Sequence, residues 1–145
     1  MANTLLVTGA AGFIGANFVH YWLRTYPQDT VIAYDALTYA GTRASLATLE
    51  GLPQFRFVQA DIRDEETVSQ LLRDQQVTHL VHFAAESHVD RSISGPDAFI
   101  DTNIVGTHSL LKAARAVWLD EGDGKEHRIH HVSTDEVYGS LTKDD

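Results

Sequence analysis

Three glycines at three-residue spacing form the clearest chemical pattern in this chain: Gly9, Gly12 and Gly15, within the segment TLLVTGAAGFIG at residues 4–15. They follow a short apolar run and precede an amphipathic segment at 17–24, which is the order strand, tight turn, helix. Glycine there allows a positive φ, close approach of a ligand and tight helix packing, and free amides at the helix start attract a pyrophosphate. Because glycine-rich turns also occur without a ligand, the spacing alone leaves both interpretations open.

An aspartate stands where a dinucleotide site needs one. Asp35 lies 20 residues beyond Gly15, at the end of the β-rich apolar run 30–34. A carboxylate there can accept hydrogen bonds from the adenosine ribose, although an aspartate at a strand end also serves as a turn residue. Its coincidence with the glycine turn indicates dinucleotide binding. NAD is favoured over NADP, since Asp35 repels a 2′-phosphate and Ala10 and Ala11 supply no arginine to receive it.

Five apolar runs predict the strands that position these residues, and helical segments alternate with them. The strands are expected at 5–7, 30–34, 55–60, 78–85 and 128–134, and the helices at 17–24, 43–50, 64–75 and 96–118. This alternation predicts right-handed βαβ units in a Rossmann-like, doubly wound parallel α/β sheet with strand order 3-2-1-4-5. Residues 86–94 are predicted to form a polar connection. The apolar positions of the last helix are spread widely enough to contact more than one neighbour, including a second subunit.

Composition excludes several classes of partner. The 145 residues carry 20 acidic and 11 basic side chains, a formal charge of -9, so a broad nucleic-acid or anionic-membrane surface is not expected. The absence of cysteine excludes disulfides and cysteine nucleophiles and fits a cytoplasmic protein. Neither a signal peptide nor a membrane span is indicated. The length and the 43% hydrophobic content suit a single domain over residues 1–145.

The eight histidines do not predict a metal site. His79 and His82 fall on opposite faces of one predicted strand, and His130 and His131 on opposite faces of another, so neither pair converges. Without cysteine and without a His pair at helical spacing, zinc is not expected. His88, in the polar connection, is left without an assigned role.

Four further motifs carry a resemblance to a known family. The glycine pattern is similar to that of the extended short-chain dehydrogenases. Within that group the chain resembles the dTDP-glucose 4,6-dehydratases in the segments DALTYAG (35–41), AAESHVDRSI (84–93), TNIVGT (102–107) and STDEVYG (133–139). These segments span nearly the whole chain. The last one discriminates best, because related sugar-nucleotide epimerases usually have small or hydroxyl residues where this chain has Asp135 and Glu136.

The resemblance implies an NAD site built at the carboxyl ends of the strands. Beside the pyrophosphate turn it places Phe13 and Ile14. The implied contacts to the ribose, the adenine and the nicotinamide side are, in that order, Asp35, Ala36, Leu37 and Thr38; Asp61 and Ile62; and Phe83, Ala84, Ala85 and Thr102. A buried strand without a ligand would also contain residues such as Phe83 and Ala84.

The implied reaction converts dTDP-glucose to dTDP-4-keto-6-deoxyglucose through transient reduction of NAD and loss of water. By resemblance, Glu136 removes the C5 proton, Asp135 protonates the departing C6 hydroxyl, and Ser87 and Thr134 face the sugar. Adjacent acids can take these opposite roles only if their pKa values differ and if strand alternation has ended before them. Outside that context the two acids would be ordinary solvated loop residues.

The Tyr-x-x-x-Lys pair of this family, which serves the C4 chemistry, has no counterpart here: Tyr138 is followed by Thr142, and Lys143 is one position too far along. A sixth strand and a C-terminal substrate region are also missing. We therefore expect the N-terminal NAD-binding part of a longer homodimeric enzyme, inactive alone. Another NAD-dependent sugar-nucleotide epimerase or decarboxylase and a noncatalytic dinucleotide-binding fragment are the alternatives. Arg91 is expected to pair either with a substrate phosphate or with Asp90.

Overall fold

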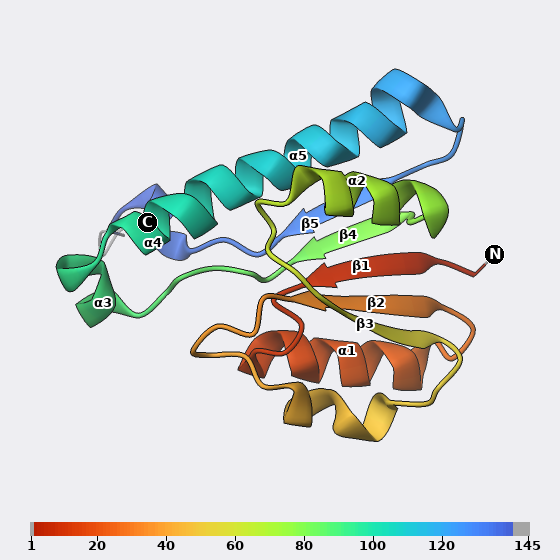
Figure 1. The fold of residues 1–145 in the computed structure, drawn as a ribbon, viewed down its shortest axis with the longest axis horizontal. Coiled ribbons are helices and arrows are strands. Elements are labelled where there is room, and N and C mark those ends of the chain that lie inside the picture. Colours follow the sequence, from red (N-terminus) through yellow and green to blue (C-terminus); the bar gives the residue numbers. More distant parts are fainter. Residues whose placement is uncertain (1, 141–145) are drawn as a thin grey trace.

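The computed structural model describes residues 2–140, which contain a five-stranded parallel sheet (Figure 1). Its strands are β1 (Thr4–Thr8), β2 (Thr30–Asp35), β3 (Phe55–Gln59), β4 (His79–His82) and β5 (Arg128–His131). The order across the sheet is β3-β2-β1-β4-β5, and every neighbouring pair is parallel. The predicted fold class and strand order are confirmed.

Helices cover both faces of the sheet. The helix α1 (Phe13–Thr25) and the 3₁₀ helix η1 (Arg43–Leu49) lie on one face, and α2 (Glu65–Asp74) and α5 (Thr107–Arg115) lie on the other (Figure 1). All strand arrowheads point to the edge where the short helix α3 (Val89–Ser94) lies. The carboxyl ends of the strands therefore meet at one edge, which is where an open α/β sheet binds its ligand.

Strand alternation sorts the core into two layers. The register pairs Leu6 with Ile32 and with Leu80, and these three buried side chains belong to the layer under α2 and α5. Leu5 and Val7 point the other way and join the layer under α1 and η1. Since both faces of the sheet are covered, the central strands read as nearly continuous apolar runs.

The start of α2 shows how local sequence sets a helix boundary. The Asp64 carboxylate caps the helix by accepting the Thr67 backbone N–H at 3.1 Å, and Glu65 and Glu66 follow in the first turn. Capping and early negative charge both stabilise a helix N-terminus. Hydrogen bonds from Thr67 also lower the pKa of Asp64. The predicted helix at this acidic run is confirmed.

The predicted helix over 96–118 is continuous, but it runs on to Gly122 and is not α-helical throughout. It consists of α4 (Asp97–Phe99), η2 (Ile100–Gly106), α5 and η3 (Ala116–Gly122), and η2 and η3 are π-helical. Its buried side includes Leu110 and Trp118. Its exposed apolar side chains are Ile100, Ile104, Val105, Leu111 and Leu119. No helix within residues 2–140 is long and apolar enough to cross a membrane.

The sequence-based expectations missed one short helix and placed the ends of two strands too late. The polar connection 86–94 contains α3, which has no buried residue and therefore leaves no apolar period in the sequence. The strands β4 and β5 stop at His82 and His131, short of the predicted ends at 85 and 134. The pairing of β4 with β1 ends where β1 itself stops, at Thr8, because the glycine turn begins there.

Candidate functional site

The turn after β1 needs glycine at two positions for packing alone. Gly9 has φ +68, and a Cβ atom on it would lie 2.6 Å from the backbone nitrogen of Ala84. A Cβ atom on Gly15 would collide with the carbonyl oxygen of Gly9. These glycines let β1, β4 and the start of α1 approach one another closely. Their presence is thus explained by the fold.

The third glycine is not explained in that way. A Cβ atom on Gly12 would meet only the Gly9 carbonyl oxygen, at 3.4 Å, so the protein leaves room for a side chain there. Gly12 is also the N-cap of the 13-residue helix α1, which has no side-chain cap and no acid in its first turn. The first amides of such a helix need a partner from outside. Phe13 and Ile14 follow with exposures of 85% and 62%. This combination suits a bound pyrophosphate.

The turn is joined to the end of β2 through Asp35, which is 8% exposed. Its Oδ2 accepts the N–H of Ala11 at 2.8 Å, and its Oδ1 accepts the N–H of Leu37 at 2.8 Å. The structure therefore brings together the two signals that were 20 residues apart in sequence. A carboxylate offers about four acceptor positions, so Asp35 can still accept hydrogen bonds from a ligand hydroxyl. Its contact with a ribose stays a prediction.

The neighbours of Asp35 form the rim of the same edge. Leu37 is half-buried and has φ +53, and the hydrogen bond from its backbone N–H to Asp35 stabilises this conformation. Ala36 and Thr38 are exposed. A Cβ atom on Gly41 would lie 2.8 Å from Asp35 Oδ1, so the loop passes close beside the carboxylate. The backbone of the segment predicted to contact the ribose therefore folds closely around the Asp35 carboxylate.

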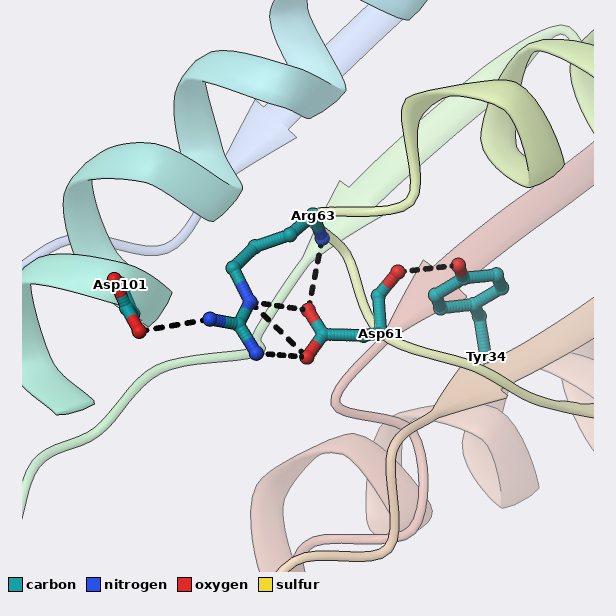
Figure 2. Close-up of polar contacts among 4 residues, drawn as sticks. All are labelled: Tyr34, Asp61, Arg63 and Asp101. Atoms are coloured by element: carbon teal, nitrogen blue, oxygen red, sulfur yellow. Dashed lines mark hydrogen bonds and ion pairs between the residues drawn. The ribbon is translucent and has the colours of Figure 1, made fainter.

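The expected adenine residues follow β3, the strand beside β2. Asp61 is half-buried and is contacted by Arg63 and Tyr34 (Figure 2). The side-chain hydrogen bond from Arg63 lowers the pKa of Asp61, so this carboxylate is ionised near neutral pH. Ile62 is 5% exposed, and a Cβ atom on Gly106 of the long helix would overlap it. Asp61 and Ile62 therefore sit between β2 and the long helix.

The expected nicotinamide side follows β4. The Phe83 N–H donates to the Thr8 carbonyl oxygen at 3.0 Å, and the Phe83 ring lies 5.3 Å from the Phe18 ring of α1. Ala84 packs against Gly9, whereas Ala85 is exposed. Phe83 and Ala84 thus lie beside the glycine turn. Thr102, the remaining predicted contact, is half-buried on the π-helical segment η2.

The substrate and acid–base residues lie beyond β4 and β5. Ser87, Thr134 and Asp135 are exposed, and the Thr134 hydroxyl donates to Asp135 Oδ1 at 3.4 Å. Because β5 ends at His131 and the 3₁₀ helix η4 spans Asp135–Tyr138, strand alternation does not separate the two acids. The Glu136 side chain is outside the described structure, as are Thr142 and Lys143.

Sequence reasoning missed a buried histidine beside this edge. His82 is 3% exposed, with Nδ1 2.7 Å from Thr8 Oγ1 and Nε2 3.0 Å from Thr107 Oγ1. Burial, aided by His131, whose ring is stacked at 4.9 Å, lowers the pKa of His82 to about 4. Within residues 2–140 no three His, Cys, Asp or Glu side chains are grouped to hold a metal ion. His82 is therefore a neutral side chain that connects β4 with β1 and with α5.

Sequence reasoning also missed Tyr39, which contacts Arg91, the residue expected to pair with a substrate phosphate or with Asp90. The guanidinium carbon of Arg91 lies 3.9 Å from the centroid of the Tyr39 ring, a cation–π contact between the loop after β2 and α3. Burial and the nearby Glu86 carboxylate raise the pKa of Tyr39. Sequence offered no signal for this contact, because the partners are 52 residues apart.

The sheet order, the glycine turn and the acid at the end of β2 define the class as a Rossmann-type dinucleotide-binding domain. The sequence profile described as GDP-mannose 4,6 dehydratase matches residues 6–145, and the chain belongs to that family.

Individual relatives agree with this assignment. The chain is 52% identical over 141 residues to a dTDP-glucose 4,6-dehydratase of Mycobacterium tuberculosis, covering 97% of this chain and 39% of the relative. The crystal structure of DesIV, a dTDP-glucose 4,6-dehydratase from Streptomyces venezuelae with NAD and TYD bound, matches with TM-score 0.85 and 50% identity over 97% of this chain and 42% of DesIV. UDP-glucose 4-epimerase from Brucella ovis, in complex with NAD, matches with TM-score 0.79 at 26% identity, over 98% of this chain and 39% of the epimerase. The chain thus spans about two fifths of the length of these relatives.

Proposed function

We propose that this chain forms the NAD-binding part of a dTDP-glucose 4,6-dehydratase, a lyase of deoxysugar biosynthesis. The observation that carries the proposal is the contrast in identity. The M. tuberculosis dehydratase is 52% identical to the chain and DesIV 50%, against 26% for the B. ovis epimerase of the same fold. The acid pair at 135–136 supports the same choice.

The residues present fit an NAD molecule. Gly12 leaves space in front of an uncapped helix start, where the pyrophosphate would be held by backbone amides. Asp35 is fixed by two amides and has acceptor positions left for the ribose hydroxyls. A 2′-phosphate would place negative charge against this carboxylate, so the site selects NAD over NADP.

The remaining cofactor contacts follow the strand ends. Asp61 and Ile62 would border the adenine, between β2 and the long helix. Phe83, Ala84, Ala85 and Thr102 would border the nicotinamide side, next to the glycine turn. These residues follow β3 and β4, and the strand order puts β2 and β1 between those two strands. A dinucleotide bound across the carboxyl ends of the strands would lie along this row.

The elimination is assigned to residues after β5. When bound, NAD supplies the oxidation of C4 and the later reduction of C6. The C4 ketone acidifies the C5 proton, which Glu136 accepts, while Asp135 gives a proton to the departing C6 hydroxyl and so releases water. Thr134 and Ser87 hold the sugar. The Thr134 hydroxyl donates to Asp135 Oδ1, and this contact supports a role for Thr134 in orienting that acid.

The test uses the full-length gene product and dTDP-glucose. We expect formation of the 4-keto-6-deoxy sugar without net accumulation of NADH, and no product from residues 1–145 alone, because this stretch has no tyrosine followed by lysine at the fourth position. Incubation with UDP-glucose tests the epimerase alternative, and incubation with UDP-glucuronate, which carries a C6 carboxylate, tests the decarboxylase alternative. If the full-length product binds NAD but converts none of the three sugars, the noncatalytic alternative holds.

We also propose a homodimer in the cytoplasm. The exposed apolar side chains Ile100, Ile104 and Leu111 lie on the long helix, where burial against a second copy would remove them from water. The net charge of -9 disfavours nucleic acid and anionic membranes as partners. Sedimentation velocity of the full-length gene product checks the dimer, and a monomer at micromolar concentration contradicts it.

A further inference from the structure

Arg63 holds the Asp61 carboxylate from one side through three donors (Figure 2). Its Nη2 donates to Asp61 Oδ2 at 2.8 Å, its Nε lies 3.2 Å from both oxygens, and its backbone N–H donates to Oδ1 at 2.8 Å. A planar guanidinium in this fork geometry fixes the orientation of a carboxylate as well as its charge.

The backbone of Asp61 is held from the other side. The Tyr34 hydroxyl donates to the Asp61 carbonyl oxygen at 2.7 Å, and Tyr34 itself is 0% exposed in the core (Figure 2). With main chain and side chain both fixed, the carboxylate has one orientation. The Nε–H is shared between the two oxygens, so three N–H hydrogens occupy three of the carboxylate's about four acceptor positions. One position is left for a single further N–H donor.

The same arginine reaches the long helix. Arg63 Nη1 donates to Asp101 Oδ2 at 2.8 Å. Asp101 is followed by Thr102 and then by Asn103, whose side-chain amide bonds both the N–H and the carbonyl of Glu86 at 2.8 Å. Arg63 therefore connects the segment after β3 with the helix that holds the segment after β4.

A surface role in stability does not account for this arrangement. The three charged side chains are 43–52% exposed, and exposed ion pairs stabilise proteins little. Arg73 provides a comparison, since it makes a similar two-nitrogen contact to Glu121 at 2.6 and 2.9 Å with side chains about half exposed. That pair also joins the α2 region to the long helix, but it lies away from every predicted cofactor residue.

We propose that Arg63 is a positioning residue that orients Asp61, so that its open acceptor position receives the 6-amino group of the cofactor adenine. The proposal rests on the proposed function, because it requires NAD with its adenine beside Asp61. It assigns Arg63 no contact with the reacting atoms.

The experiment compares two cofactors on the full-length gene product freed of bound nucleotide. Calorimetric titration gives the Kd of NAD and of nicotinamide hypoxanthine dinucleotide, in which a carbonyl oxygen replaces the 6-amino group and so cannot donate to Asp61. The variants are Arg63→Met, Arg63→Lys and the matched control Arg73→Met. In the unmodified protein and in Arg73→Met we expect NAD to bind about tenfold more tightly than the hypoxanthine analogue, as one hydrogen bond to a charged group predicts.

Arg63→Met is expected to bring the two Kd values within about twofold by weakening NAD alone, and Arg63→Lys to restore part of the difference through its charge. Thermal unfolding should shift equally in Arg63→Met and Arg73→Met. If Arg63→Met keeps the tenfold preference, or if Arg73→Met loses it too, the positioning role is wrong. If the unmodified protein shows no preference between the two cofactors, the adenine placement in the proposed function is wrong instead.

Discussion

At the scale of single residues, Asp35 has a structural role beside the binding role that we propose for it. Its two oxygens accept the N–H groups of Ala11 and Leu37, so the carboxylate closes the glycine turn onto β2 before any ligand arrives. Hydrogen bonds to charged groups in such buried places are worth more than ordinary ones. The carboxylate that we propose for ribose recognition is therefore already oriented by the fold.

Replacing Asp35→Asn tests both roles. The amide presents an N–H₂ group to a backbone N–H, so we expect the free energy of unfolding to fall by about 1–3 kcal/mol. The affinity for NAD should fall at least about tenfold, since a charged acceptor is lost. Urea unfolding and NAD titration measure the two effects. Asp74→Asn, an exposed site at the end of α2, serves as control, and an equal loss there would contradict the assignment.

The glycines of the turn are expected to divide into two kinds. Gly15→Ala forces a methyl group onto the Gly9 carbonyl and should lower the free energy of unfolding by more than about 2 kcal/mol. Gly12→Ala should change it by less than about 1 kcal/mol, because room exists, yet should weaken NAD binding. Unfolding curves and NAD titration of both variants measure the two effects. Unimpaired NAD binding by Gly12→Ala would contradict the proposed placement of the pyrophosphate beside Gly12.

At the scale of elements, His82 joins three of them. It lies on β4 between Thr8 of β1 and Thr107 of α5, within hydrogen-bonding distance of both hydroxyls. A protonated imidazole can only donate, and burial opposes its charge. The junction of these elements at the carboxyl edge therefore depends on a neutral ring.

The low pKa of His82 predicts a pH dependence of stability. The pKa is about 4 in the folded protein and about 6.5 in an unfolded chain, so the unfolded state takes up a proton first as the pH falls. The contribution of neutral His82 to the free energy of unfolding is therefore fully present above pH ~6.5 and is lost as the pH falls toward ~4. The loss is about 1.4 kcal/mol per pH unit and about 3 kcal/mol in total. His82→Gln should flatten this part of a urea-unfolding series across pH. The exposed-site variant His108→Gln should leave it in place, and an unchanged slope in His82→Gln would refute the link.

At the scale of the whole molecule, stability comes from two apolar layers on a shared sheet. Leu80 on β4 is 1% exposed and belongs to the layer under α2 and α5. Its neighbour Val81 is 6% exposed and belongs to the layer under α1. Loss of one layer would uncover a face of the sheet that positions the candidate site, so we expect core packing to affect binding there.

Leu80→Ala is expected to lower the free energy of unfolding by about 2–5 kcal/mol, because it removes buried methyl groups and leaves a cavity at the centre of one layer. Leu119→Ala, at a site 75% exposed on the long helix, should cost less than about 0.5 kcal/mol in the monomer. Chemical unfolding of both variants provides the comparison. Similar losses at the two sites would contradict the two-layer description of the core.

Much of the fold was predictable because its signals are local. The apolar runs predicted all five strands and the alternation with helices predicted their order, since right-handed crossovers leave few arrangements. The acidic start of α2 was readable for the same reason. By contrast α3, which buries nothing, and the π-helical segments of the long helix have no distinct period in sequence.

The sequence by itself determined the sheet and the glycine turn, because residue type and spacing dictate strand, turn and helix. It also predicted that the turn and Asp35 serve one dinucleotide site. Only the tertiary structure decided what depends on distant partners. It showed that Gly9 and Gly15 serve packing whereas the fold leaves room for a side chain at Gly12. It also joined Arg63 to Asp101, 38 residues away, because contacts across strand ends arise from chain folding and leave no periodic mark in the sequence.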